Sequence, residues 1–219
     1  MLVQLPLDGG DDRRGRIVGG LSTVGYAVEP VYFSPVLVRA LQREIKLRDR
    51  RNEFQEASIG RNALQQQNDW VRRDRTRWLD ASSLAQCRLL EEFESLRLLI
   101  NRELFLGLFD FESHFAVYDP GAFYKRHLDA FNGDNPRLVS VVVYLNSAWS
   151  PADGGCLRIW PERDARRAVL DVVPRAGTLV CFLSERIPHE VLAANRERFS
   201  IAGWFRRNTT TSLCLDPPR

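Results

Sequence analysis

Lysine, histidine and cysteine are scarce in this 219-residue sequence, and each scarcity limits what the chain can be. Lysine occurs only at Lys46 and Lys125, so arginine carries nearly all the positive charge, which indicates a bias of the genome before a bias of function. The formal net charge is only +3 and the basic residues are scattered, which argues against a nucleic-acid-binding protein. No run of apolar residues is long enough to span a membrane.

The four cysteines, at positions 87, 156, 181 and 214, lie far apart and form no Cys-x-x-Cys pair. The spacing alone does not decide whether the cysteines form disulfide bonds, but a reduced cytoplasmic protein is the simpler interpretation. Residues 1–16 contain few apolar residues, include the charged run Asp11-Asp12-Arg13-Arg14 and lack a signal-peptide core, so we expect a flexible tail. Hydrophobic residues make up 44% of the chain, which predicts one domain over residues 17–219.

Two amphipathic helices are expected in the first half of the chain. Ser34-Pro35 begins the first, which covers Val36 to Arg48. The second covers Ser82 to Leu104 and carries a stripe of leucine and phenylalanine typical of core packing. Residues 49–78 between them are polar and weakly periodic, which indicates a solvated loop or short hairpin, although lids and substrate clamps have the same character.

Beyond Phe109 the sequence changes to short runs of β-branched and aromatic residues separated by turn residues such as Asp119-Pro120-Gly121. These runs cover residues 115–118, 138–145, 156–160, 168–173, 178–183 and 199–205. Many short strands at this spacing predict two packed sheets. We therefore expect an α+β protein with a jelly-roll core, a double-stranded β-helix, supported by amino-terminal helices.

A candidate metal site is formed by His127-Leu128-Asp129 together with His189. Residues i and i+2 of a strand point to the same side, so His127 and Asp129 can reach one ion, and His189 would come from a distant strand. Two histidines and one carboxylate with open coordination positions are typical of non-haem Fe(II) oxygenases. The tripeptide alone is weak evidence, because buried histidines beside an aspartate are common. The candidate site as a whole is better supported, because it contains two of the three histidines in the sequence.

Arg198 follows His189 by nine residues and begins a segment that alternates like an inward-facing strand. A buried arginine is costly unless an anion meets it, and a dicarboxylate would do so through bidentate hydrogen bonds. A zinc hydrolase with the same ligands would lack an evident general base and would leave Arg198 without a purpose, so we rank it last.

Residues 118–207 resemble the 2-oxoglutarate- and Fe(II)-dependent prolyl hydroxylase domains, especially the branch that includes the animal oxygen-sensing enzymes and their bacterial relatives. The matching residues are Tyr118-Asp119-Pro120-Gly121, Tyr124-Lys125-Arg126-His127-Leu128-Asp129, Asn132-Gly133-Asp134, Val143-Tyr144-Leu145-Asn146, Trp149, Gly154-Gly155-Cys156-Leu157-Arg158-Ile159, Pro188-His189-Glu190-Val191, Arg198 and Trp204. Their order and spacing agree over roughly ninety residues.

The resemblance implies a role for nine residues within a catalytic core of about 112–207. It implies three iron ligands, His127, Asp129 and His189. It implies four residues at 2-oxoglutarate, namely Arg198, Tyr144, Tyr118 and Ser200. It implies two contacts to a protein substrate, Arg137 and Trp204, and it places residues 53–69 in a substrate-covering loop.

Each of these roles has a simpler structural alternative. Tyr118 and Tyr144 would serve equally as half-buried sheet aromatics, Trp204 as core and Arg137 as a solvated turn residue. His114 is expected to be structural, and Gly154-Gly155 to form a turn or bulge, because no helix follows it to make a phosphate site.

The resemblance implies an enzyme that hydroxylates a prolyl residue of a protein, with Fe(II), 2-oxoglutarate and O2, ascorbate in support, and no catalytic residue beyond the metal centre. Elongation factor Tu is the candidate substrate, because bacterial relatives are associated with it. Two alternatives stay open: a hydroxylase of a free amino acid or small metabolite, and a binding protein that keeps the fold without turnover.

Overall fold

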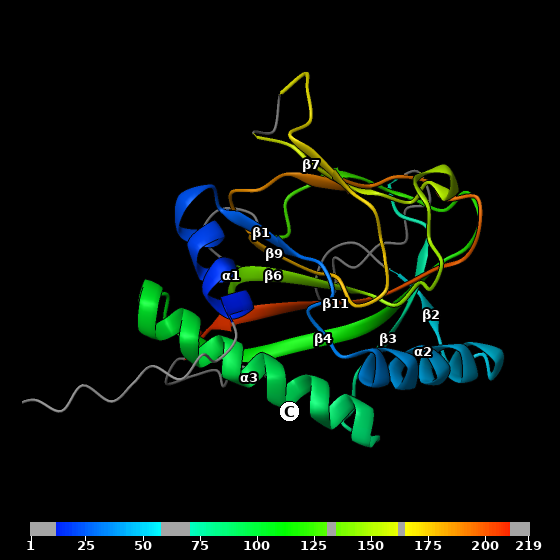
Figure 1. Cartoon of the computed structure of the whole chain (residues 1–219), viewed down its shortest axis with the longest axis horizontal. Coiled ribbons are helices and arrows are strands. Elements are labelled where there is room, and N and C mark those ends of the chain that lie inside the picture. Colours follow the sequence, from blue (N-terminus) through cyan, green and yellow to red (C-terminus); the bar gives the residue numbers. More distant parts are fainter. Residues whose placement is uncertain (1–11, 58–70, 131–134, 162–164, 211–219) are drawn as a thin grey trace, which may run out of the picture.

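The structure is a computed structural model that describes residues 12–57, 71–130, 135–161 and 165–210. In these ranges three helices lie against a pair of antiparallel sheets (Figure 1). The helices are α1 (Asp12–Thr23), α2 (Pro35–Arg50) and α3 (Leu84–Leu104), and a single 3-10 turn covers Pro151–Asp153. None of the described helices combines the length and the apolarity needed to cross a membrane.

The larger sheet has the strand order β1-β9-β6-β11-β4-β3-β2, and each strand is antiparallel to its neighbours. Its strands are β1 (Tyr26–Glu29), β2 (Gln55–Glu56), β3 (Asp74–Trp78), β4 (Leu108–Tyr118), β6 (Arg137–Tyr144), β9 (Leu179–Leu183) and β11 (Arg198–Arg207). The smaller sheet has the order β5-β10-β7-β8, with β5 (Tyr124–His127), β7 (Leu157–Ile159), β8 (Leu170–Val172) and β10 (His189–Val191).

Successive side chains along the strands of the larger sheet point to opposite faces, and both faces are packed against other elements. On β4, Phe115 and Val117 join the core under the helices, whereas Ala116 and Tyr118 face the smaller sheet. The smaller sheet contributes residues such as Leu157 and Ile159 to this second core. Two sheets packed face to face, with helices covering the outer face of one, confirm the predicted α+β jelly roll.

The two predicted helices are present, and local sequence explains their ends. Ser34 caps α2 by accepting a hydrogen bond from the amide of Leu37, and Pro35 occupies the first turn, where a missing N–H costs nothing. Ser83 caps α3 in the same way, and α3 ends at Leu104, as predicted.

Helix α1 was not predicted, and it begins inside the segment that we expected to be a tail. Ile17 and Leu21 are buried on the main core, and Arg14 forms a bidentate ion pair with Glu92 of α3. Residues 12–16 of the expected tail therefore belong to α1, whereas residues 1–11 lie outside the described residues.

Every predicted strand segment contains a strand, and the polar stretch before α3 contains the expected short hairpin. Its strands β2 and β3 pair through Gln55 and Thr76. Most of the expected substrate-covering loop, residues 58–69, lies outside the described residues. The sequence did not predict the short strand β1, and it placed His189 on a distant strand without predicting the bounds of β10.

Candidate metal centre and co-substrate pocket

The two histidines of the candidate triad lie opposite each other on neighbouring strands. His127 ends β5, His189 begins β10, and the two are direct partners in the antiparallel register. Asp129 follows His127 by two residues. The ligand atoms of the three side chains all lie within 4.8 Å of one another, with Asp129 Oδ1 3.5 Å from His127 Nε2 and Oδ2 3.7 Å from His189 Nε2.

Backbone carbonyls fix which ring nitrogen of each histidine is available. His127 Nδ1 lies 2.7 Å from the carbonyl oxygen of Lys125, and His189 Nδ1 lies 3.1 Å from that of Ile187. Because a carbonyl only accepts, each Nδ1 is the protonated donor, and each Nε2 presents a lone pair toward Asp129. Burial and the neighbouring His127 lower the pKa of His189 to about 4, so its ring is neutral at pH 7, as a metal ligand must be.

Asp129 supplies the negative charge of the site. Burial alone would raise the pKa of its carboxyl group, but His189, His127 and the hydroxyl of Ser140 together lower this pKa well below its usual value. The group is therefore an ionised acceptor. Two imidazole nitrogens and one carboxylate, gathered from separate strands with room on one side, are a donor set that fits Fe(II).

Arg198 begins β11 and is only 1% exposed, yet the described residues give it no carboxylate partner. Its Nε donates to the carbonyl oxygen of Gly155 at 2.9 Å, and its Nη1 donates to Ser200 Oγ at 3.3 Å. The rings of Tyr118 and Tyr144 flank the guanidinium at 4.9 and 5.1 Å.

Two buried polar atoms at this arginine lack a hydrogen-bond partner among the described residues, Arg198 Nη2 and Tyr144 Oη. A buried cation and a buried hydroxyl left without partners are costly, and a carboxylate would satisfy both. The pair therefore fits an acidic co-substrate such as 2-oxoglutarate. Burial raises the pKa of Tyr144 to about 12, so the hydroxyl keeps its proton for donation.

Close approach explains the glycine beside Arg198. A Cβ atom on Gly155 would lie 2.9 Å from the Ala194 Cβ and 3.1 Å from the Arg198 Cδ, and its φ of 69° disfavours other residues. Gly154 also has a positive φ, ends the 3-10 turn Pro151–Asp153 and forms an isolated β-bridge with Ala194. The carbonyl oxygen of Gly155 accepts the hydrogen bond that orients Arg198. The role of this segment is therefore to position the arginine and not to bind a phosphate.

The triad and Arg198 line one cavity of about 650 Å³, which Tyr118 and Ser200 also border. Arg137 and Trp204 line the same cavity. The Arg137 guanidinium stacks on the Trp204 ring at 3.5 Å and is held by a 2.7 Å ion pair to Glu112. The structure thus brings eight of the nine predicted site residues to one cavity wall, and Tyr144 joins them through its contact with Arg198.

His114 borders this cavity too, although we expected only a structural role. It is 4% exposed and lies between the rings of Trp78 and Trp204, at centroid distances of 5.3 and 5.4 Å. Burial, reinforced by Arg72, lowers its pKa to about 4.

Two further contacts at the site were not predicted from the sequence. The ring of Tyr124 stacks on His127 at 3.5 Å, and Arg72 covers Tyr124 while its guanidinium makes an ion pair with Asp74. This stack supports the ring of His127 from the side of β3. Tyr124 and His127 lie three residues apart on β5, whereas Arg72 comes from the segment before β3, so its contact depends on the assembled fold.

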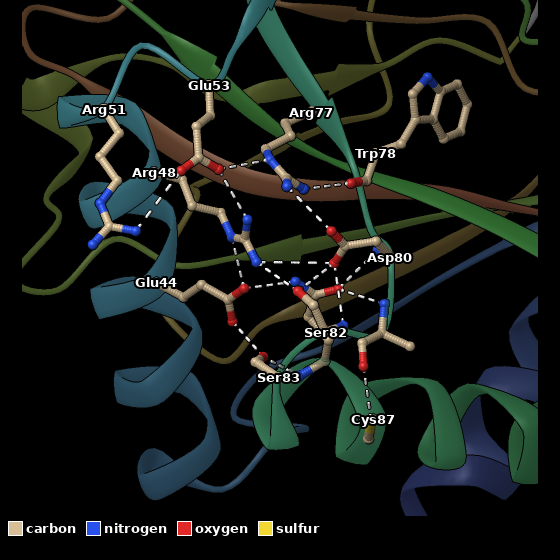
Figure 2. Close-up of polar contacts among 12 residues, drawn as sticks. Glu44, Arg48, Arg51, Glu53, Arg77, Trp78, Asp80, Ser82, Ser83 and Cys87 are labelled. Atoms are coloured by element: carbon tan, nitrogen blue, oxygen red, sulfur yellow. Dashed lines mark hydrogen bonds and ion pairs between the residues drawn. The ribbon is translucent and has the colours of Figure 1, made fainter.

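A network of charged residues anchors the β2–β3 hairpin beside the cavity (Figure 2). Arg48 of α2 donates to Glu44, Glu53 and Ser82, and Arg77 of β3 donates to Glu53 and Asp80. Glu53, just before β2, is therefore shared by two arginines. Because Glu53, Arg77 and Trp78 also line the cavity, the network fixes one of its walls.

This sequence and fold are similar to those of known oxygenases. The family model of the 2OG-Fe(II) oxygenase superfamily matches residues 113–206. A prolyl-4-hydroxylase from Pseudomonas putida has the same fold, with a TM-score of 0.80 and 45% identity over 89% of this chain and 98% of that chain. The chain belongs to the prolyl hydroxylase family of Fe(II)- and 2-oxoglutarate-dependent oxygenases.

Two animal prolyl hydroxylases match over the core alone. Human Egl nine homolog 1 is 42% identical over 87 residues, which cover 39% of this chain and 20% of that protein. A Caenorhabditis elegans hypoxia-inducible factor prolyl hydroxylase is 40% identical over 93 residues, 41% of this chain and 12% of that protein. The match spans about a quarter or less of these curated relatives. A Trichoplax adhaerens prolyl hydroxylase, at 24% identity and a TM-score of 0.78, shares the fold.

Fe(II), 2-oxoglutarate and O2 are the cofactor and co-substrates that this prolyl hydroxylase family implies. The donor set of the triad fits the metal, and the unsatisfied atoms of Arg198 and Tyr144 fit the oxo acid.

Proposed function

We propose that this protein hydroxylates a prolyl residue in a protein substrate, with Fe(II), 2-oxoglutarate and O2. The observation that carries the proposal is the meeting, in one cavity, of a three-residue metal site with a buried arginine that has one donor without a partner among the described residues. Metal site and anion site are both needed for this chemistry, and neither explains the other structurally.

In this proposal His127, Asp129 and His189 hold the iron, and Arg198 with Tyr144 binds the distal carboxylate of 2-oxoglutarate. Ser200 accepts from Arg198 Nη1, and Tyr118 flanks the guanidinium, so both steady the arginine. Bound iron, 2-oxoglutarate and O2 would supply the oxidation, in which one oxygen atom of O2 enters succinate as the oxo acid loses CO2 and the other becomes the hydroxyl group of the substrate.

The protein's own part is to orient the reactants and to exclude water. Phe182, Leu157 and Val191 line the cavity with apolar surface around the triad, and Phe182 lies 4.4 Å from the ring of His189. A dry wall strengthens the electrostatic interactions at the iron and protects the reaction from side products.

A protein substrate is favoured by the far side of the cavity. The rim of the cavity there is broad and carries aromatic, positive and negative side chains. It consists of Arg137 stacked on Trp204 and of the wall formed by Glu53, Arg77 and Trp78. The relative from C. elegans is named for a protein substrate, which supports the same class here. Elongation factor Tu is our candidate substrate, with ascorbate as a supporting reductant and a cytoplasmic location.

The test is mass spectrometry of purified elongation factor Tu after incubation with the protein, Fe(II), ascorbate, 2-oxoglutarate and air, with succinate followed in the same tube. A gain of one oxygen on a proline, lost in His127→Ala, is the expected result. Succinate without that mass shift would reject this substrate and favour a free amino acid or metabolite. Bound iron with neither signal would favour a binding protein without turnover.

A further inference from the structure

A short chain of buried hydroxyl groups ends on the carboxylate of Asp129. Ser140 Oγ lies 2.6 Å from Asp129 Oδ2, and Ser184 Oγ lies 2.9 Å from Ser140 Oγ. Ser140 is 1% exposed and Ser184 is fully buried. Buried polar groups are nearly always hydrogen-bonded, and here the partners lead directly to the candidate metal site.

The direction of the hydrogen bonds follows from the geometry. Ser140 Oγ donates its single proton to Asp129 Oδ2, since a carboxylate that binds a metal is deprotonated and only accepts. The oxygen of Ser140 then accepts from the hydroxyl of Ser184. The chain therefore runs one way, from Ser184 through Ser140 to Asp129, and Ser140 makes the charge-assisted bond, which is the stronger of the two.

The backbone around these serines leaves the chain little freedom. Ser140 lies in the middle of β6, and the Ser184 amide, just after β9, donates to the carbonyl oxygen of Leu138 at 3.0 Å. The carbonyl oxygen of Ser184 accepts from the amide of Ala130, the residue after Asp129, at 3.3 Å. The same short segment therefore supports the Asp129 loop through both its backbone and its side chain.

We propose that Ser140, supported by Ser184, is a positioning residue that fixes the Asp129 carboxylate so that it offers Oδ1 to the metal and withholds Oδ2. Both oxygens face a histidine, with Oδ1 3.5 Å from His127 Nε2 and Oδ2 3.7 Å from His189 Nε2, but Oδ2 is the one that accepts from Ser140. A carboxylate that binds through one oxygen occupies one coordination position and leaves the others open for co-substrates. The inference rests on the proposed function only in requiring that these three residues bind a metal.

The experiment uses Co(II) as the probe, because its visible absorption reports ligand number and geometry without turnover. Its Kd is measured by competition with a coloured chelator. Ser140→Ala should raise the Kd about tenfold and change the absorption bands, whereas Ser140→Thr, which keeps the hydroxyl, should restore both. Ser184→Ala should raise the Kd less than Ser140→Ala does. Ser113→Ala, which removes a buried serine of β4 that does not line the cavity, is the matched control.

Each outcome decides a different point. Wild-type affinity and spectrum in Ser140→Ala would overturn the positioning role and leave the proposed function intact. Failure of the wild-type chain to bind Co(II) would overturn both. If Ser140→Ala does not fold, Ser140→Cys takes its place, since its thiol is similar in size but a weak donor, and it must show the raised Kd.

Discussion

Arg198 and Tyr144 show how a single buried residue can indicate a ligand. Folding places a guanidinium and a phenol side by side in the core, and an N–H and an O–H remain without partners in the part of the chain that the structure describes. A protein selected only for stability would fill such a site with apolar groups, because unpaired buried polar atoms lower stability. The residues are retained at that cost, which is understandable if a carboxylate satisfies them.

Tyr144→Phe should therefore have opposite effects on stability and on binding. Without co-substrate the variant should be as stable as the wild type or more stable, because it removes an unsatisfied buried hydroxyl. The KM for 2-oxoglutarate should rise at least about tenfold, since a hydrogen bond to a charged group is worth about 1.5–3 kcal/mol. Urea unfolding and succinate production measure the two effects. Tyr26→Phe, at a half-buried tyrosine of β1, is the control, and a loss of stability without a change in KM would contradict the assignment.

Asp129→Asn tests the charge of the metal site at nearly constant shape. The amide keeps an oxygen for Ser140 but removes the negative charge that the two histidines surround. We expect metal affinity to fall at least about tenfold and turnover to be lost, as a change of the ligand itself should exceed the effect of an outer partner. Isothermal titration with Fe(II) under nitrogen and succinate release measure both, and full activity in this variant would remove Asp129 from the ligand set.

At the scale of elements, the hairpin β2–β3 depends on charges more than on apolar contacts. β2 has two residues, both exposed, and pairs with β3 alone. Ion pairs to α2 and to Asp80, in the loop that precedes α3, hold the hairpin instead (Figure 2). Isolated surface pairs contribute little, but Arg48 is only 16% exposed and its pairs form a network.

Arg77→Met should loosen this wall of the cavity and leave the metal and co-substrate sites intact. Arg77 contacts Glu53, Asp80 and the Trp78 carbonyl oxygen, whereas none of its described contacts reaches the triad or Arg198. We therefore expect the KM for the protein substrate to rise severalfold while the KM for 2-oxoglutarate stays unchanged. Steady-state kinetics with each substrate varied in turn provides the comparison.

The control for Arg77→Met is Arg88→Met. Arg88 makes an exposed pair with Glu91 on α3, with 65% and 63% of the two side chains accessible. Both variants remove one positive charge, but only Arg77 lies on the cavity. An equal rise in KM for the two variants would mean that net charge, and not the hairpin wall, governs the interaction with the substrate.

The sequence predicted those elements whose signal is local. Two helices are predicted by the capping residues Ser34 and Ser83 and by the apolar stripe of α3. Runs of β-branched and aromatic residues predict β6, β9 and β11. Helix α1 contains three glycines in twelve residues and buries only Ile17 and Leu21, so its apolar pattern is too sparse to recognise. Strand β10 has three residues, too few to show a period of two.

The residues of the candidate site likewise fall into those that the sequence predicts and those that only the structure shows. His127 and Asp129 share a two-residue spacing, and Arg198 interrupts an apolar strand, so both could be found in the sequence. The hydroxyl chain of Ser140 and Ser184, the contact of Arg72 with Tyr124 and the ion pair of Arg48 with Glu53 join residues from separate segments with no fixed spacing. Contacts of this kind depend on the assembled sheets, so only the structure shows them.

For the molecule as a whole, metal and co-substrate should act as linked stabilisers of the folded state. A ligand that binds only the folded state adds about 2.7 kcal/mol at a concentration one hundred times its Kd. We expect 2-oxoglutarate to raise the unfolding temperature in the presence of Mn(II) under nitrogen, and to do so much less in Arg198→Gln. Differential scanning fluorimetry measures the shift, and equal stabilisation of both proteins would show that the oxo acid binds elsewhere.

The stability of the metal-free protein should fall between pH 7 and pH 5, partly because of His114. Burial lowers the pKa of His114 to about 4, whereas the unfolded chain has a pKa of about 6.5. Between these values the unfolded state binds a proton that the folded state does not, so stability decreases as the pH falls through 6.5 toward 4. The cost from this residue is about 2 kcal/mol at pH 5.

His114→Gln should remove that share of the pH dependence. The amide donates to the carbonyl oxygen of Phe115, as His114 Nδ1 does in the wild type, but it does not titrate. Unfolding free energies from urea titrations in EDTA at pH 7 and pH 5 should therefore differ by about 2 kcal/mol less in the variant than in the wild type. His189, buried with a pKa of about 4, keeps its own contribution in both proteins, so a smaller slope must remain. An unchanged slope would mean that His114 is protonated in the folded state, and that the cavity wall between Trp78 and Trp204 holds a positive charge at pH 5.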